Sequence, residues 1–335
     1  MLLTGALRAL STVWGAPCDV VANPAWIDTV LAPLDSVGEV FGLHSRRTPY
    51  AVSGEQRDLV GWLRRRGPSP TYVIDSHEKM VALVRRGGIP GDLVVSGLDA
   101  PQQPLEHHFD FLIRLVGTVP PGASGRPATL FPDPVPRPEL VVSQEDVAAA
   151  KTWLQAHQWR GEPLVLIQTL SRRAKRGRWP ENSWVATIGN ILRRLGDVRV
   201  VLIGGPHEAE KTRSISIRCD DSRVVTTGRW ASLGRLFALI SLAHSMISLD
   251  TGPVHVAAAL GLPVIVLAGS AHVRRYHPLA TPERARVVAA IPEADWPDDP
   301  AAFEQVHSTA AISVGQVMDA WEEIRAEVDR GSSFR

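Results

Sequence analysis

The chain has 335 residues, 44% of them hydrophobic and 21% charged, which is an ordinary globular composition and excludes a disordered or fibrous protein. Its length suits two α/β domains of about 150 residues each. Because 36 basic and 35 acidic residues leave a net charge of +1, the overall charge does not favour nucleic acid or an anionic membrane, and any anion-binding site must be local.

The two cysteines and the apolar segments indicate neither a metal site nor a membrane anchor. Cys18 and Cys219 lie far apart and lack the spacing of metal ligands, which fits unreactive thiols in a reducing cytoplasm. The apolar start of the chain lacks the basic segment of a signal peptide and is interrupted by Arg8, so an amphipathic helix explains it better. No other segment approaches the ~20 apolar residues of a spanning helix, and we expect a cytoplasmic protein without a transmembrane segment.

Short apolar segments alternate with helix-like segments in the first half of the chain. Each predicted strand is short and apolar, as in a parallel sheet that is covered on both faces. The predicted strands are 19–22, 36–40, 71–75 and 92–96, and the predicted helices are 2–13, 26–34, 53–65 and 78–86. The proline-rich stretch 120–138 that follows is typical of a linker between domains.

The second half alternates strands and helices more regularly. The predicted strands are 164–168, 199–203, 223–226, 245–249 and 264–267, and the predicted helices begin at Ser143 and then cover 184–195, 208–218, 233–243, 254–260 and 314–328. This alternation predicts a doubly wound parallel sheet with right-handed crossovers, in which ligands bind at the carboxyl ends of the strands. The predicted division is a first Rossmann-like domain over 1–135, a second over 136–310 and a terminal helix within 311–335.

The strongest local signal lies where a buried strand meets an alanine-rich helix. Asp250 or Thr251 can cap that helix, and Pro253 stands where a missing N–H costs nothing. Gly252 lets a ligand approach the backbone, so the free N–H groups of the first turn form an anion site suited to a diphosphate. His255, one turn into the helix, can then bond a phosphate or sugar oxygen. The alternative is an ordinary strand–helix junction with a solvent-facing histidine.

A pair of glycines and then an acidic residue follow the predicted strand 199–203. Glu208 comes shortly after Gly204 and Gly205, where a carboxylate can accept hydrogen bonds from ribose hydroxyls. The same residue can instead be a first-turn acid that stabilises its helix by a few tenths of a kcal/mol. Both interpretations remain open at this point.

A basic loop follows the strand 164–168. Its segment 172–178 holds five basic residues, Lys175 and Arg176 among them, in a protein of net charge +1. Such a cluster suggests a bound phosphate, although most charge runs are solvated surface loops. No second basic stripe or aromatic platform accompanies the loop, so nucleic acid is not expected as a partner.

Polar residues also follow a strand in the first half of the chain. Asp75, His77 and Lys79 lie beyond the strand 71–75 and are candidate acceptor contacts, unless they only cap the next helix. Arg274 has a similar place beyond the strand 264–267 and is a fourth candidate.

In this order and spacing, these segments resemble glycosyltransferase family nine, the ADP-heptose heptosyltransferases. The segment SLDTGPVHVAAALGLPVIVL carries the resemblance most specifically. Family-like pieces are also found at Gly204–Glu208, at Trp179–Pro180 and over 227–233 and 312–317. The resemblance implies the GT-B fold, with two Rossmann-like domains facing a central cleft and a C-terminal helix crossing back to the first domain. It also implies a donor held by the second domain, an acceptor held by the first, and no metal or other cofactor.

The resemblance assigns roles to the candidate donor residues. Glu208 is expected to bind the ribose, and Thr169, with Ser171 in the same loop, to flank the nucleotide. The diphosphate and sugar are expected to be held by the Asp250–Thr251–Gly252 junction and His255. Family members carry a lysine two residues before the Trp-Pro pair. Gly177 stands there in this chain, so Lys175 or Arg176 is expected to take over the phosphate contact.

A second departure concerns the start of the chain. Family members begin with a strand and a Gly-Asp loop before a helix that resembles residues 2–10, so the expected general-base aspartate falls upstream of Met1. Two explanations stay open: the true start lies further upstream, or the protein is a shortened relative of weak or no activity. His77 or Asp75 could replace the base only if the cleft closes to within ~3 Å of the acceptor hydroxyl.

The sequence therefore predicts an inverting glycosyltransferase that moves a sugar onto a saccharide hydroxyl, such as that of a lipopolysaccharide core. Heptose from ADP-heptose is the expected donor sugar, and a lipid-linked acceptor would bring the protein to the inner face of a membrane. One alternative is a transferase for another nucleotide-sugar and a protein or small-molecule acceptor. The other is a catalytically silent homologue that binds a nucleotide-sugar.

Overall fold

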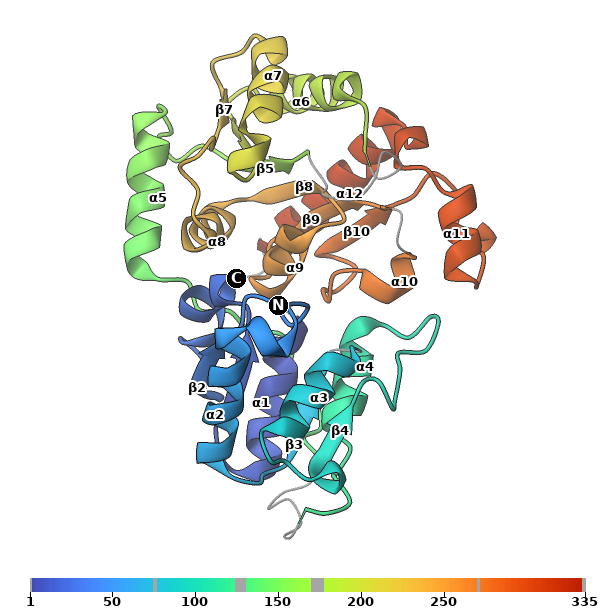
Figure 1. Cartoon of the computed structure of the whole chain (residues 1–335). Helices are drawn as coiled ribbons and strands as arrows, with labels where there is room; N and C mark the ends of the chain where they lie inside the picture. Colours follow the sequence, from blue (N-terminus) through green and yellow to red (C-terminus); the bar gives the residue numbers. More distant parts are fainter. Residues whose placement is uncertain (1, 75–76, 124–130, 170–177, 270–271, 333–335) are drawn as a thin grey trace. The chain divides into compact units, whose positions relative to one another are not determined.

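The computed structural model describes residues 2–74, 77–123, 131–169, 178–269 and 272–332 (Figure 1). The chain divides into two compact units, Met1–Val141 and Val142–Arg335, so the first unit ends a few residues beyond the predicted boundary. No helix in these ranges is long and apolar enough to cross a membrane.

The first unit pairs its strands in parallel, β1 with β2 and β3 with β4, and these two pairs form separate sheets in the described ranges. Its strands are β1 (Cys18–Ala22), β2 (Val37–Gly42), β3 (Thr71–Val73) and β4 (Val94–Ser96). Its longer helices are α1 (Leu2–Trp14), α2 (Gly54–Arg66), α3 (Glu78–Arg86) and α4 (His108–Val116), the last of which was not predicted. The predicted helix 26–34 is instead a short π-helical turn, Ile27–Leu31. Pro33, which has no N–H to donate, cannot continue the helical hydrogen bonds beyond it.

The end of the first unit is fixed against α1. A Cβ added to Gly5 would lie 2.5 Å from the carbonyl oxygen of Pro136, so the chain after the proline-rich stretch packs directly on this helix. The Thr4 hydroxyl accepts a bond from the Glu139 N–H at 2.9 Å, and Arg8 pairs with the Glu139 carboxylate at 2.7 Å. These contacts explain why the predicted linker, 120–138, belongs to the first unit up to its end.

The second unit is built on one parallel sheet of six strands in the order β10-β9-β8-β5-β6-β7. The strands are β5 (Leu164–Gln168), β6 (Arg199–Ile203), β7 (Val224–Thr226), β8 (Ser245–Leu249), β9 (Val264–Leu267) and β10 (Ala285–Val288). The helices are α5 (Gln144–Ala156), α6 (Glu181–Leu195), α7 (Ala209–Cys219), α8 (Leu233–Leu242), α9 (Gly252–Ala259), α10 (Val273–Tyr276), α11 (Pro300–Val306) and α12 (Val314–Ser332). The first five strands were predicted, whereas β10, α10 and α11 were not.

The core of the second unit explains this order. Every residue of β5, β6 and β8 is buried, as is expected of central strands in a parallel sheet with helices on both faces. On one face, alternate strand side chains such as Ile167 and Leu202 pack against Trp184 of α6 and Ile215 of α7. The carboxyl ends of all these strands therefore meet at one edge of a rigid sheet.

The last helix, α12, completes the same face. Val317, Met318, Trp321 and Ile324 belong to its core, and the Trp321 indole N–H donates to the Ser245 hydroxyl at 3.2 Å. The buried side chains of α12 cover the sheet of the second unit, because they close apolar surface that the strands would otherwise expose to water. That this helix also packs back on the first domain stays a prediction.

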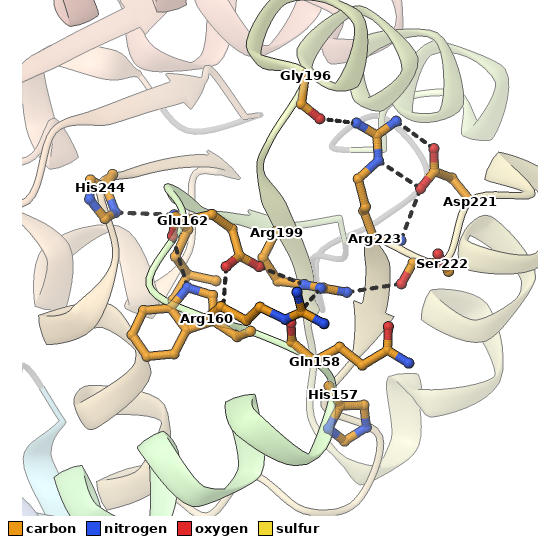
Figure 2. Close-up of polar contacts among 12 residues, drawn as sticks. His157, Gln158, Arg160, Glu162, Gly196, Arg199, Asp221, Ser222, Arg223 and His244 are labelled. Carbon is orange, nitrogen blue, oxygen red and sulfur yellow. Dashed lines mark hydrogen bonds and ion pairs between the residues drawn. The ribbon is translucent and has the colours of Figure 1, made fainter.

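A buried ion pair holds the amino-terminal edge of this sheet (Figure 2). The Glu162 and Arg199 side chains are only 6% and 8% exposed and approach to 3.2 Å. Arg199 also donates to the carbonyl oxygens of Gln158 and Ser222, each at 3.0 Å. Burial opposes ionisation of Glu162, but bonds from the backbone N–H of Arg160 and from its own backbone, together with Arg199, hold its pKa below the ordinary value. The pair is therefore charged and fully hydrogen-bonded.

Neighbouring strands are fixed at the same edge. Arg223, just before β7, pairs with Asp221 at 2.7 Å and holds the pKa of that carboxyl below its ordinary value (Figure 2). His244, just before β8, accepts a bond from the N–H of Leu164 at 3.0 Å through Nδ1. The amino ends of β5, β6, β7 and β8 are thus joined by side chains as well as by strand pairing.

We expect Glu162→Gln to lower the free energy of unfolding by about 3 kcal/mol, because it leaves the Arg199 charge buried without its partner. Glu181→Gln is the matched control, since its pair with Arg218 is about half exposed and contributes less than about 1 kcal/mol. Urea unfolding at neutral pH measures both. Because the folded-state pKa of Glu162 is lowered from 4.5, its contribution is present above that value and is lost as the pH falls below it. Equal losses in the two variants would contradict this account.

Candidate functional site

The second unit has a topological switch point between β5 and β8. From β5 the chain moves outward to β6 and β7, then returns to the other side of β5 and continues through β8, β9 and β10. Connections leave β5 and β8 in opposite directions, and open α/β sheets bind ligands outside the carboxyl ends of strands arranged in this way. Thr169 follows β5 and Asp250 follows β8 directly, so the structure brings these two predicted residues to that end of the sheet.

Side-chain contacts join the two strand ends. The Thr251 hydroxyl lies 3.3 Å from Oε1 of Gln168 and 3.2 Å from the carbonyl oxygen of Leu249, and it can donate to either. The N–H of Asp250 donates to the carbonyl oxygen of Leu267 in β9 at 3.2 Å. The predicted junction after β8 is thereby fixed between its two neighbouring strands.

The amino terminus of α9 is open. Thr251 is its N-cap residue, as predicted, but the Thr251 side chain makes no capping hydrogen bond because it points to Gln168 and Leu249 instead. A Cβ added to Gly252 would meet no atom within 4 Å, so space is present beside this backbone. His255 lies one turn further along and is half-buried, rather than facing solvent fully. The arrangement suits a bound anion.

The end of β5 carries a second sign of a ligand. Thr169 is 3% exposed, and its hydroxyl has no hydrogen-bond partner among the atoms that the structure describes. Buried hydroxyls are nearly always bonded, so this group is suited to meet a ligand atom. Ser171, Lys175 and Arg176 fall in 170–177, outside the described residues, and their roles stay predictions.

Glu208 stands at the carboxyl end of β6. Its Oε2 accepts a bond from the Gly205 N–H at 2.8 Å, while its own N–H donates to the Gly205 carbonyl oxygen at 2.8 Å. A Cβ added to Gly204 would lie 3.2 Å from Glu208 and from Thr212, so glycine is needed for this close packing. The residue is therefore a first-turn cap, and its remaining lone pairs suit a ligand hydroxyl as well.

His77 and Lys79 have structural partners in the first unit. Nδ1 of His77 accepts a bond from the Lys79 N–H at 3.3 Å and caps α3. Nζ of Lys79 donates to the carbonyl oxygen of Arg47 at 3.0 Å. These contacts favour the alternative in which polar residues cap the next helix. Asp75 lies outside the described residues.

Arg274 belongs to α10 in the second unit and pairs with Asp298 at 3.0 Å. It borders a groove of about 850 Å³ beside β10, to which Trp296 and Asp319 also contribute. The predicted acceptor residues are thus divided between the two units. Among the described residues, no group of three or more histidine, cysteine, aspartate or glutamate side chains could hold a metal ion.

Two buried histidines, which the sequence did not reveal, lie at the start of α10 and at the end of α11. His272 is 1% exposed: its Nδ1 accepts from the Arg274 N–H at 3.2 Å, so its Nε2 carries the proton and donates to the Pro297 carbonyl oxygen at 2.9 Å. His307 is 2% exposed, stacks on Phe303 and accepts a bond from Ala290 at 3.3 Å. Burial lowers the pKa of His307, against an opposing effect of the Gly269 backbone.

The His307 site predicts how stability depends on pH. Its folded-state pKa is lowered from 6.5, so below that pH the unfolded chain binds a proton that the folded chain does not. The free energy of unfolding should fall as the pH drops from 7.5 to 5.5, by at most about 1.4 kcal/mol per pH unit for one group. Urea unfolding of His307→Gln should give a shallower slope, and exposed His207→Gln should leave it unchanged. The same slope in His307→Gln and wild type would refute the assignment.

A comparison with protein families gives one match. The model of glycosyltransferase family 9 (heptosyltransferase) matches residues 126–297, or 172 of 335 residues, and this range includes the switch point. Lipopolysaccharide heptosyltransferase 1 of Salmonella typhimurium is 31% identical over 128 residues, which are 38% of this chain and 38% of that protein. The sequence match therefore spans well under half of this curated relative.

Solved structures match over nearly the whole chain. A family 9 glycosyltransferase of Veillonella parvula has a TM-score of 0.76 at 17% identity, covering 97% of this chain and 93% of that one. The ADP-heptose lipopolysaccharide heptosyltransferase II of E. coli has a TM-score of 0.73 at 21% identity, covering 98% and 96%. At these identities the likeness concerns the fold, which is the GT-B fold that the resemblance implied.

Proposed function

Since the chain belongs to glycosyltransferase family 9, we propose that it transfers a sugar from a nucleotide-diphospho-sugar to an acceptor hydroxyl, with the donor bound by the second unit. One observation carries the proposal: Thr169, Glu208 and the Asp250–Gly252 junction follow three adjacent strands, β5, β6 and β8, at the switch point. Adjacent parallel strands place these groups along one edge, and nucleotides bind at such edges.

The geometry supports a division of roles within the donor. The open first turn of α9 faces the diphosphate, since the positive end of the helix dipole and the room beside Gly252 both favour an anion there. The Thr169 hydroxyl, which has no partner among the described atoms, meets the same group from β5. Glu208 accepts hydrogen bonds from the ribose hydroxyls at the end of β6, and His255 contacts a phosphate or sugar oxygen. Ser171, Lys175 and Arg176 are proposed as further donor contacts.

The chemistry follows from this placement. The acceptor oxygen attacks the anomeric carbon, and the bond from that carbon to the diphosphate breaks with inversion. Negative charge grows on the departing diphosphate, where the α9 terminus stabilises it. We assign no described residue to the general base that removes the acceptor proton, and Asp75, His77, Lys79 and Arg274 remain proposed acceptor contacts. Independence of metal rests on the family resemblance, and full transfer in the presence of a chelator tests it.

ADP-heptose is the donor we propose, and a lipopolysaccharide core saccharide the acceptor, because the matched relatives are named as lipopolysaccharide heptosyltransferases. Such an acceptor is lipid-linked, so the protein would meet it at the inner face of a membrane. A transferase for another nucleotide-sugar is the second candidate. The two candidate donors are separated by the nucleobase that the site prefers, because both donors carry a diphosphate.

Calorimetric titration tests donor binding. The chain should bind ADP more tightly than UDP or GDP, and Glu208→Ala and Asp250→Ala should each weaken ADP by about 10- to 100-fold, as for hydrogen bonds to charged groups. Glu210→Ala is the control, since it removes an exposed acid two residues further along. If the folded chain binds none of the three nucleotides, the assignment of the donor site is wrong. Preference for UDP or GDP would favour the second candidate.

Gly252 offers an independent test. Because a Cβ there meets no atom within 4 Å and the backbone is not left-handed, Gly252→Ala should leave the melting temperature nearly unchanged. The added methyl group should nevertheless occupy space that the diphosphate needs, and weaken ADP binding at least about 10-fold. Gly91→Ala, equally open, is the control and should alter neither quantity. Unchanged ADP binding in Gly252→Ala would place the diphosphate elsewhere.

Transfer itself is measured as ADP released from ADP-heptose when an acceptor saccharide lacking heptose is added. Acceptor-dependent release supports the proposed enzyme. Tight ADP binding without release from either ADP-heptose or another ADP-sugar would instead favour a silent nucleotide-sugar-binding homologue.

A further inference from the structure

Gln168 is a buried amide at the end of an apolar strand. It is the last residue of β5, 5% exposed, after four buried aliphatic residues. A buried amide is costly unless its polar atoms are bonded. Here Oε1 lies 3.3 Å from the Thr251 hydroxyl, across the pairing of β5 with β8, and shares it with the Leu249 carbonyl oxygen at 3.2 Å. The side chain at position 168 therefore affects the hydrogen bonding of the Thr251 hydroxyl.

Thr251 is the N-cap residue of α9, where its hydroxyl could instead accept a hydrogen bond from a backbone N–H of that helix. N-cap threonines ordinarily accept a bond from an N–H of the first helical turn. Pro253 has no N–H to offer, and the Val254 N–H donates to the carbonyl oxygen of Thr251 at 3.1 Å. The Thr251 hydroxyl makes no capping bond and is held towards Gln168. An anion at α9 therefore meets no competing side-chain oxygen from the N-cap residue.

We propose that Gln168 is a positioning residue for the diphosphate. By accepting the Thr251 hydroxyl together with the Leu249 carbonyl oxygen, its amide keeps that oxygen away from the first turn of α9, so the anion meets no competing side-chain oxygen there. The inference rests on the proposed function. A separate observation points to a ligand at the same strand end: the neighbouring Thr169 hydroxyl is 3% exposed and has no partner in the described part of the chain.

The proposal requires that Gln168 act through the Thr251 hydroxyl. Replacing it by methionine, of similar length but without the amide acceptor, leaves the Thr251 hydroxyl with only the Leu249 carbonyl oxygen, so the hydroxyl turns more easily towards α9 and competes with the anion. A residue that only fills the core would alter stability without any dependence on Thr251. The two roles are therefore separated by a double-mutant cycle on ADP binding.

The cycle compares ADP affinity in wild type, Gln168→Met, Thr251→Val and the double variant, with thermal unfolding recorded for each. Gln168→Met should weaken ADP by about 3- to 10-fold, as for loss of one neutral hydrogen bond. In the Thr251→Val background, which has no hydroxyl to release, the same substitution should change ADP affinity less than about 2-fold. Thr251→Ser, which keeps the hydroxyl, should restore the sensitivity to Gln168→Met.

Two results would overturn the inference: no change in ADP affinity in Gln168→Met, or an equal loss whether or not the Thr251 hydroxyl is present. If Gln168→Met does not fold, Gln168→Asn, whose amide is too short to reach Thr251, takes its place in the cycle with the same expected pattern. Failure of the proposed function is distinct, because then wild type itself does not bind ADP.

Discussion

The parallel pairing of β5 with β8 is the contact on which the site in the second unit depends. These strands are consecutive neighbours in the sheet but are separated in the chain by β6, β7 and three helices. Their register sets Gln168 opposite Ser248, so the residues that follow them emerge side by side. The crossovers on either side diverge, and α9 begins directly after β8 at this point of divergence. The position of the site is thus a consequence of strand order, before any particular side chain is considered.

The two ends of this sheet use polar groups in opposite ways. At the amino ends, Arg199 is bonded to Glu162 and to two carbonyl oxygens, so its charge is fully compensated and contributes to rigidity. At the carboxyl ends, Thr169 keeps a buried hydroxyl without a described partner and Thr251 withholds its hydroxyl from α9. A buried hydroxyl without a partner and an uncapped helix end both lower the stability of the fold, and a bound ligand would offset that loss. The bonded polar groups at the amino ends of the strands stabilise the sheet and so offset the loss of stability at the carboxyl ends.

Much of the second unit could be predicted because its strands are short apolar runs between clear helix signals. The Asp250–Gly252 junction was found for the same reason, since strand, turn and helix are contiguous in sequence. The partner of Thr251 could not be found, because Gln168 lies 83 residues away and only the strand order brings them together. β10 was not predicted because it is an edge strand whose residues, Arg286 among them, are mostly only partly buried, so its apolar pattern is weak. The burial of His307 was not predicted because it depends on long-range packing. In the first unit the strands are partly exposed, so their pattern was weaker.

Glu208 shows how two interpretations that a sequence leaves open can be compatible with each other. Its bond with Gly205 is local, three residues apart, and follows from the Gly-Gly-x-x-Glu spacing alone. That bond also fixes the carboxylate at the end of β6 before a ligand arrives, because Gly204 allows the side chain to pack closely over the turn. A carboxylate already ordered loses less conformational entropy when it binds a hydroxyl. Capping and the proposed ribose binding therefore do not exclude each other: the cap would preorganise the proposed contact, and a glutamate without it would bind the same hydroxyl more weakly.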